Sequence, residues 1–465
     1  PSITMTAPAA TVHHQDRGLF TDLYELTMAQ VFYQQEMFAP ATFSLFIRSY
    51  PPNRAYFVAA GLEDVLDYLE CLKFGTDSLE YLRSTGMFTE EFLNYLAGLR
   101  FTGSVRAIPE GRLFFANEPV LEVTAPIMEA QIAETFILNQ VNFQTLLTTK
   151  ASRCAQATHG RLLADFASRR THGTDAALKM GRCSYIGGFQ STSNVLAAQR
   201  YGIPPSGTMA HSFVSSFPTE KESFRAYARS FPDRSILLLD TYDTIKGAWN
   251  AVDIAREMES MDHRLVAVRL DSGDFADLSR RVRRILDDAG LNYVKVLASG
   301  GLDEYEIEEL VQGGAPIDMF GVGTKAGVSV DAPSTDMAYK LVGYDHRPVM
   351  KLSEGKAYLP GGKQVFRSRD YKGDFSGDVI GQSQEDLAGA EPLLRTVMTG
   401  GRRTALSPTL KEIRETLEEE LSHLSDQYKL LRNPSRYPVK ASDNLQRLAA
   451  QVEQEIASAE DFSGA

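Results

Sequence analysis

Short, nearly continuous apolar runs alternate with helical patterns through the middle of the chain. The spacing of amphipathic helices recurs in TIKGAWNAVDIAREMES, DLSRRVRRILDDAG and DEYEIEELVQGG. The clearest apolar runs lie in RLLADFAS, SILLLDTYD, RLVAVRLDSGD, NYVKVLASGG and IDMFGVGT. Such runs are typical of strands that are buried on both faces, and repeated strand–helix units of roughly 30 residues indicate a parallel sheet. We therefore predict an α/β barrel over residues 135–344.

The regions on either side have a different pattern. Residues 16–134 begin with a helical pattern over 19–37, where Thr21 precedes the apolar positions, and continue with mixed strands and helices. Residues 345–465 run from Gly-rich hairpin patterns to two charged terminal helices, in which Glu418–Glu420 is expected to form a solvated face. We expect residues 345–465 to pack on residues 16–134 as one discontinuous α/β domain, and residues 1–15 to form a flexible tail.

Polar residues and glycines follow the apolar runs of the middle region. Strand carboxyl ends converge on one face of a parallel barrel, which is where active sites lie. A single Asp there is more often a helix N-cap and a single Gly more often a turn, so the recurrence at several strand ends carries the functional interpretation. These groups are Ser168–Arg170, Ser206–Thr208 with His211, Asp240–Asp243, Arg269 with Asp271–Asp274, Ser299–Gly301 and Gly323–Lys325.

Two of these groups are rich in glycine and precede predicted helices. Ser299–Gly301 stands just before a helical pattern, and Gly321–Thr324 ends the next apolar run. Glycine lets backbone N–H groups approach an anion closely, and a helix N-terminus adds a favourable dipole. The pair predicts a phosphate site, with two tight turns as the alternative.

His211 is one of eight histidines, and none of them has partners at metal-ligand spacing. A structural metal is therefore not expected. Asp240, at the next strand end, could orient His211 through a ring N–H, which would make the histidine a nucleophile or an acid–base group. A histidine without a chemical role remains the alternative at this point.

Composition narrows the choice of partners. The 465 residues carry 60 acidic and 48 basic side chains, a net charge of −12 that argues against a general nucleic-acid binder. No apolar run approaches the roughly 20 residues that span a bilayer, and the first residues have no signal-peptide pattern. Three distant cysteines argue against a disulfide framework, so we expect a cytoplasmic protein.

Several stretches together resemble nicotinate phosphoribosyltransferases. They are TDLYELTMAQ, SRRTHG, YIGGFQSTSNVLAAQRYGIPPSGTMAHSF, LLDTYDT, VRLDSGD, ASGGLDE, GVGTK, and MKLSEGK with LPGGKQVFR. The resemblance implies an irregular (β/α) barrel of the type II phosphoribosyltransferase kind beside a discontinuous α/β domain. It also implies a homodimer whose active site lies near the subunit interface.

The reaction that this resemblance implies belongs to NAD biosynthesis. Phosphoribosyl pyrophosphate and nicotinate give nicotinate mononucleotide and pyrophosphate, with Mg²⁺ as cofactor. ATP is a co-substrate that is hydrolysed through a phosphohistidine.

The resemblance also implies roles for individual residues, by their positions in the shared motifs. His211 would be the phosphorylated histidine with Asp240 beside it, and Asp271 would hold the ribose hydroxyls. The planar fork of Arg269 would bind the nicotinate carboxylate in bidentate fashion. The remaining matches are Tyr24 stacking on the pyridine ring from the other subunit, Thr208 near nicotinate, Arg169 and Arg170 near the ligand anions, and Ser299, Gly300, Gly301, Gly323 and Thr324 around the 5′-phosphate.

One position departs from the family's sequence pattern. Ala167 stands where the family commonly has Gly, and because Ala disfavours a positive φ, the loop geometry near Arg169 is in question.

Three other functions stay open. A nicotinamide-specific relative would need no arginine to balance a charge on the substrate. A non-catalytic phosphosugar-binding protein would keep the glycine loops but lose the histidine and carboxylates. An aldolase-type barrel would need a strand lysine, and Lys295 is the candidate we considered.

Overall fold

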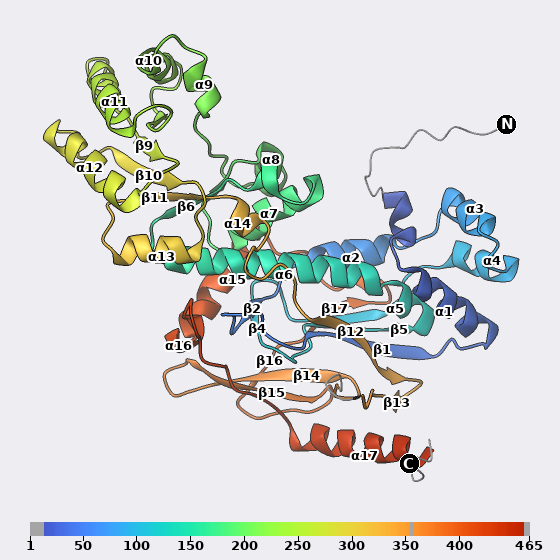
Figure 1. The fold of residues 1–465 in the computed structure, drawn as a ribbon. Helices are drawn as coiled ribbons and strands as arrows, with labels where there is room; N and C mark the ends of the chain where they lie inside the picture. The colour runs from blue at the N-terminus through green and yellow to red at the C-terminus, as the bar shows by residue number, and fades with distance from the viewer. Residues whose placement is uncertain (1–13, 354–357, 460–465) are drawn as a thin grey trace, which may run out of the picture.

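Six parallel strands form the sheet of the middle region in the computed structural model, which describes residues 14–353 and 358–459 (Figure 1). Their order is β7-β6-β11-β10-β9-β8, so the sheet is an open barrel with β7 and β8 at its edges. The strands are β6 (Leu162–Asp165), β7 (Ser191–Thr192), β8 (Ile236–Leu238), β9 (Ala267–Leu270), β10 (Lys295–Ser299) and β11 (Met319–Val322). The predicted barrel strands are thus present in the predicted segments. The expected tail over residues 1–15 lies almost wholly outside the described residues.

Helices follow these strands, and acidic residues begin three of them. Asp243 accepts a hydrogen bond from the Lys246 backbone N–H, while Asp274 and Asp303 cap the next two helices. The helices of this region are η2 (Ser168–Arg170), α7 (Thr174–Ile186), α8 (Val195–Tyr201), α9 (His211–Ser215), α10 (Glu220–Ser230), α11 (Thr244–Glu259), α12 (Phe275–Asp288), α13 (Glu304–Gln312) and α14 (Thr324–Gly327). Asp240 and Asp271 cap no helix, so helix capping does not explain why these carboxylates stand at the strand ends.

Both ends of the chain build a second sheet, of order β13-β12-β1-β5-β3-β17-β18. Its strands are β1 (Pro40–Ile47), β3 (Ser104–Ala107), β5 (Leu121–Pro126), β12 (Met337–Tyr344), β13 (Arg347–Pro348), β17 (Arg395–Thr399) and β18 (Arg402–Arg403). Early strand β1 pairs with late strand β12, and β3 pairs with β17. The discontinuous α/β unit is therefore present. The exact domain boundaries stay a prediction.

A four-stranded sheet and a two-stranded ribbon lie beside this sheet, and α17 forms the lowest layer in Figure 1. The strands are β14 (Lys363–Arg369), β15 (Phe375–Gln382), β16 (Glu391–Pro392) and β19 (Val439–Ala441), with β2 (Phe57–Val58) and β4 (Leu113–Phe114) in the ribbon. The helices are η1 (His14–Leu19), α1 (Leu23–Gln34), α2 (Leu62–Cys71), α3 (Thr76–Ser84), α4 (Glu90–Gly98), α5 (Ile127–Ile132), α15 (Leu410–His423), α16 (Asp426–Lys429) and α17 (Asp443–Ala459). The expected solvated face of α15 is wrong at Glu420, which is 4% exposed and forms ion pairs with Arg112 and Arg367.

The long helix α6 (Glu134–Ala157) joins the two parts of the molecule. It packs against α2 and β12 in the discontinuous unit and against α13 and α14 in the barrel (Figure 1). Most of its residues are buried, including Lys150 and Arg153.

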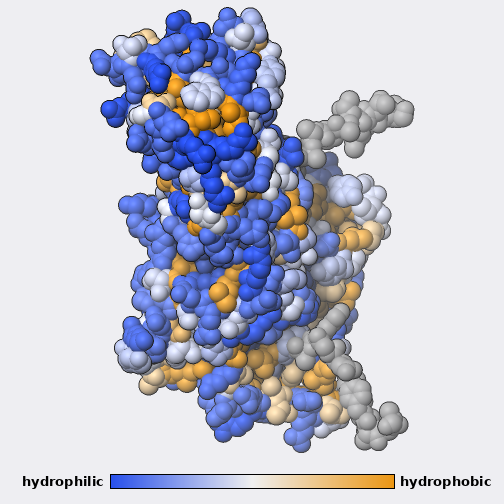
Figure 2. Space-filling model, turned by 60° about the vertical axis from the view of Figure 1, so that its left-hand side comes forward, coloured by the Kyte–Doolittle hydropathy of each residue, from blue (hydrophilic) through white to orange (hydrophobic). Residues whose placement is uncertain are grey.

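The surface is mainly hydrophilic over the barrel. Figure 2 shows apolar side chains gathered in a recess of the upper part of the molecule, which holds α9 to α12. Among the residues that the structure describes, no helix is both long enough and apolar enough to cross a bilayer.

Candidate functional site

Arg269 is the centre of a polar cluster at the carboxyl edge of the parallel sheet. Its Nε donates to Ser299 Oγ at 2.7 Å, and its Nη2 donates to Asp271 Oδ1 at 2.5 Å. Its Nη1 donates to Thr208 Oγ1 at 2.9 Å and to the Met209 carbonyl oxygen at 3.2 Å. Four of the five guanidinium N–H groups are therefore engaged within the chain. The Arg269 guanidinium thus places a positive charge at the site and keeps one N–H group for a ligand.

Asp271 is held in its charged form. Burial by itself raises the pKa of this carboxyl, but the Ser299 hydrogen bond and the positive charge of Arg269 lower it below its usual value. Ser299 Oγ lies 2.5 Å from Asp271 Oδ1, and the Asp271 side chain is 27% exposed. Asp271 is therefore a carboxylate at neutral pH, with one oxygen bound inside the cluster.

His211 joins the cluster through Asp271. Its Nε2 lies 3.6 Å from Asp271 Oδ2, and its Nδ1 lies 3.1 Å from Thr241 Oγ1. The expected pairing with Asp240 is not present, because the partner at that strand end is the next residue, Thr241. If Nε2 carries the proton toward Asp271, Nδ1 keeps a lone pair that accepts from the Thr241 hydroxyl. The side chain of His211 is 45% exposed, so a ligand can reach it.

Asp240 supports the loop after β9 instead. Its Oδ2 accepts from the Asp271 backbone N–H at 3.1 Å and from the Ser272 hydroxyl. Its Oδ1 is buried and has no hydrogen-bond partner in the part of the chain that the structure describes. A buried carboxylate oxygen without a partner is costly, and a cation or a ligand donor would satisfy it.

The two glycine loops lie side by side. Ser299 pairs in register with Gly321 across β10 and β11, which brings both loops to the same edge. Gly300 has φ +99°, and a Cβ there would lie 2.1 Å from the Asp271 carbonyl oxygen. Gly301 has φ +70° and open space around it, and Thr324 is exposed at the first turn of α14. The loop after β10 thus requires glycine where it passes the Asp271 backbone.

The two predicted arginines lie in the exposed η2 turn. Arg169 and Arg170 are exposed, and neither forms an ion pair within the described residues. Ala167 has φ −84° and ψ −25°, which any residue adopts, so replacement of the family's Gly does not strain this loop. Gly327 accommodates the alanine, because a Cβ at 327 would lie 2.7 Å from Ala167 Cβ.

Tyr24 does not belong to the cluster within this chain. It lies in α1, at the opposite side of the molecule from β9 and β10 (Figure 1). Tyr24 is 48% exposed, and its neighbours Leu23 and Val31 on the same helix are each 53% exposed. Burial and the adjacent Glu134 carboxylate raise the pKa of the Tyr24 hydroxyl.

Sequence reasoning missed several residues of the cluster. The Phe166 ring lies beneath the Arg269 guanidinium, 5.6 Å from ring centroid to Cζ. Thr241 contacts His211, and Ser272 contacts Asp240. Thr241 and Ser272 stand inside predicted residue groups without having been given a role, and Phe166 stands two residues before the group Ser168–Arg170, so position beside the strand ends was the available signal. Phe166 and Thr208 also line a hollow of about 610 Å³ beside the cluster.

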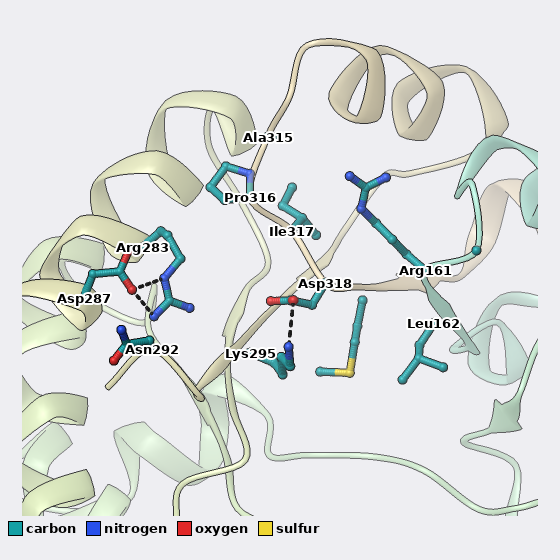
Figure 3. Close-up of a pocket in the computed structure, with 12 residues that line it drawn as sticks. Arg161, Leu162, Arg283, Asp287, Asn292, Lys295, Ala315, Pro316, Ile317 and Asp318 are labelled. Atoms are coloured by element: carbon teal, nitrogen blue, oxygen red, sulfur yellow. Dashed lines mark hydrogen bonds and ion pairs between the residues drawn. The ribbon is translucent and has the colours of Figure 1, made fainter. Parts of the chain in front are cut away.

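A second hollow, of about 660 Å³, lies at the opposite, amino-terminal end of the sheet (Figure 3). Two ion pairs lie in it, Arg283 with Asp287 and Lys295 with Asp318 at 3.3 Å, while Arg161 forms no ion pair with the described residues. Lys295 is the first residue of β10, far along the strand from Ser299. This position gives no support to an aldolase-type reaction, and the carboxyl edge remains the candidate site.

Three family models match the chain. The nicotinate phosphoribosyltransferase N-terminal domain matches residues 19–142, the nicotinate phosphoribosyltransferase family matches 162–352, and the C-terminal domain matches 386–449.

Curated relatives match over almost the whole chain. A Mycobacterium tuberculosis nicotinate phosphoribosyltransferase is 49% identical, over 92% of this chain and 92% of its own. The Bacillus subtilis nicotinate phosphoribosyltransferase is 37% identical, over 92% and 93% of the two chains. Among solved structures, human nicotinic acid phosphoribosyltransferase matches with a TM-score of 0.85 and 30% identity, over 93% of this chain and 99% of that one.

Proposed function

This chain belongs to the nicotinate phosphoribosyltransferase family, and from that premise we propose that the edge holding Arg269, Asp271 and His211 is its active site. The family reaction transfers a phosphoribosyl group to the ring nitrogen of nicotinate in NAD biosynthesis. The observation that carries the proposal is the continuous contact from Thr208 through Arg269 and Asp271 to His211.

Nicotinate fits the side of the cluster formed by Arg269, Thr208 and Phe166. The hollow lined by Phe166 and Thr208 admits a planar ring next to the guanidinium. Because four Arg269 N–H groups are already bound, a bidentate contact with the nicotinate carboxylate requires Thr208 or Asp271 to yield one of them. Arg269 thus offers a positive charge and N–H donors to the carboxylate of an acid substrate, and it offers no acceptor to the NH2 group of nicotinamide.

The phosphoribosyl group fits the other side. The ionised Asp271 faces the ribose hydroxyls, and its negative charge favours the positive charge that develops at the sugar carbon as the pyrophosphate leaves. Backbone N–H groups of Gly300, Gly301 and the first turn of α14 hold the 5′-phosphate, with Ser299, Gly323 and Thr324 completing the loops. Arg169 and Arg170 meet the anionic leaving group from η2.

Magnesium fits this donor set as an ion that arrives with pyrophosphate. No group of three metal-ligating side chains occurs among the described residues, so the protein alone offers no cage. The unpartnered Oδ1 of Asp240 and the Asp271 carboxylate match an ion that takes one or two carboxylates plus substrate phosphates. When bound, Mg²⁺ neutralises charge on the leaving oxygens.

His211 is the site of ATP coupling in this proposal. With Nε2–H directed to Asp271, the Nδ1 lone pair attacks the γ-phosphorus of ATP and the bond to ADP breaks. Before ATP reacts, the Thr241 hydroxyl holds the ring in this orientation by donating to Nδ1, and it must release that lone pair for the attack. The phosphohistidine then changes the affinity for the other substrates, and water later removes the phosphate.

A homodimer supplies Tyr24. The residue lies on the exposed apolar face of α1, away from the cluster of its own chain. A second copy that covers this face would bring its tyrosine to the pyridine ring and complete the site.

Radiolabel transfer from γ-labelled ATP tests the proposal. We expect acid-labile label on the wild-type protein and none on His211→Ala, together with nicotinate mononucleotide formation from nicotinate and phosphoribosyl pyrophosphate. The alanine variant should retain slow transfer without ATP. Stable label in His211→Ala moves the phosphorylation site elsewhere, and complete loss of ATP-independent transfer assigns His211 to the glycosyl step itself. Equal turnover of nicotinamide would contradict the proposed role of Arg269.

A further inference from the structure

A buried lysine lies behind the two glycine loops. Lys150, on α6, has a side chain that is 0% exposed. Its Nζ lies 3.0 Å from Asp303, 2.5 Å from Glu304 and 2.8 Å from Asp331. Burial of one ammonium with three carboxylates costs desolvation free energy. The cluster is therefore stable only if each of its charges has a partner.

Two of these carboxylates follow the proposed phosphate loops along the chain, Asp303 directly and Asp331 after α14. Asp303 follows Ser299–Gly301 and caps α13, where its side chain accepts from the Tyr305 backbone N–H at 3.1 Å. Asp331 follows α14, which begins at Thr324. Lys150 therefore connects the segment after β10 with the segment after β11 from behind the sheet edge.

Two further cations tie the same segments together. Arg54 binds Asp331 with both Nη atoms, at 2.9 and 3.1 Å, from the segment before β2. Glu306, in the first turn of α13, accepts from the Asp303 backbone N–H at 2.9 Å and pairs with Lys325 of α14. Because Arg54 comes from the discontinuous unit and Lys150 from α6, the loops are held against both parts of the molecule.

Charge balance explains why the cluster can be buried. Asp303, Glu304 and Asp331 carry three negative charges, and Lys150, Arg54 and Arg153 carry three positive ones. Arg153 completes the balance at Glu304, with Nε 3.0 Å from Oε1. Removal of the central cation leaves Asp303 without an ion-pair partner among the described residues and three carboxylates with only two cations, so the two loop segments repel each other.

We infer that Lys150 is a positioning residue for phosphoribosyl pyrophosphate, which sets the spacing of the two phosphate loops through Asp303 and Asp331. The inference rests on the proposed function of those loops. A residue that acts this way changes the affinity for the phosphate-bearing substrate and leaves the nicotinate side of the cluster alone, because Arg269, Thr208 and Phe166 do not contact it.

Calorimetric titration of phosphoribosyl pyrophosphate with Mg²⁺ and without nicotinate tests the inference on the full chain. We expect Lys150→Met to weaken binding about tenfold and Asp331→Asn, which lies at a partly exposed position, about threefold. Lys150→Arg should recover most of the affinity, and the nicotinate KM of all three variants should stay within about twofold of wild type. If Lys150→Met does not fold, Asp331→Asn alone decides.

Arg367→Met is the matched control. Arg367 is equally buried and binds Asp378 of β15 and Glu420 of α15, away from the loops. We expect a lower melting temperature with unchanged phosphoribosyl pyrophosphate affinity. If Lys150→Met and Asp331→Asn behave as this control does, Lys150 has only a structural role. Gly300→Ala distinguishes failure of this inference from failure of the proposed function. If Gly300→Ala also leaves the phosphoribosyl pyrophosphate affinity unchanged, the loops are not the phosphate site. Both the inference and that part of the proposed function are then wrong.

Discussion

Arg269 and Asp271 stand two residues apart at the end of β9, and their guanidinium and carboxylate meet at 2.5 Å. Residues two apart on a strand share a face, so both side chains point to the same side of the edge. The pair joins a cationic group suited to an aromatic acid with an anionic group suited to a sugar. In the proposed site, substrate selectivity and sugar chemistry are therefore coupled through one ion pair.

Replacement of Arg269 by lysine tests the guanidinium geometry while keeping the charge. An ammonium reaches only some of the partners Ser299, Thr208 and Asp271 that the planar fork now binds. We expect the nicotinate KM to rise by about tenfold or more. Steady-state kinetics at saturating phosphoribosyl pyrophosphate checks this, and an unchanged nicotinate KM would remove Arg269 from the nicotinate site.

Replacement of Ser299 by alanine should change the pH dependence of the reaction. The Ser299 hydroxyl stabilises the charged form of Asp271, so its loss raises the pKa of that carboxyl. The ionised form is the active one in the proposed site, so the activity that is lost as pH falls should be lost at a higher pH in this variant. We expect the acid limb of kcat/KM for phosphoribosyl pyrophosphate to move up by about one unit.

Ser272→Ala is the control for that experiment. Ser272 lies one residue from Asp271, yet its hydroxyl donates to Asp240. Its removal should lower activity without moving the acid limb. An equal displacement in both variants would mean that the limb reports another group.

Much of the barrel could be predicted from the sequence because its strands are short, apolar and followed by polar residues. The chemical groups at the strand ends could be found in the same way, since parallel connectivity brings all carboxyl ends to one edge. Which partner each group takes could not be predicted. Asp240 and Thr241 are neighbours in the chain, and only the backbone direction after β8 decides that Thr241 contacts His211.

The sequence also could not predict which charged residues are buried. A run of glutamates on a helix indicates a solvated face, yet Glu420 is buried because Arg367 from β14 reaches it at 2.8 Å. Helix α6 has no amphipathic pattern from which its buried face could be predicted, because polar residues such as Lys150 face the interior and pair with distant carboxylates. Partners 150 or more residues away leave no local signal at either position.

Mixed dimers should show that Tyr24 acts on the site of the other subunit. Tyr24→Ala and Asp271→Ala proteins are each expected to be nearly inactive. After unfolding and refolding together, half of the dimers contain one intact site out of two, so about a quarter of the wild-type activity should return. If Tyr24 serves its own chain, or if the protein is a monomer, mixing restores nothing.

Gly300→Ala should abolish tight binding of phosphoribosyl pyrophosphate. The residue has φ +99°, and an alanine Cβ would lie 2.1 Å from the Asp271 carbonyl oxygen, so the loop must move away from β9. That displacement separates the backbone donors of the loop from Asp271, which the proposed site needs together. Gly301→Ala is the matched comparison, because its φ of +70° strains an alanine but open space surrounds the new methyl group. We expect calorimetry to give an affinity loss of about a hundredfold for Gly300→Ala and several-fold less for Gly301→Ala. Equal losses would show that backbone strain alone, and not the contact with Asp271, sets the geometry of the loop.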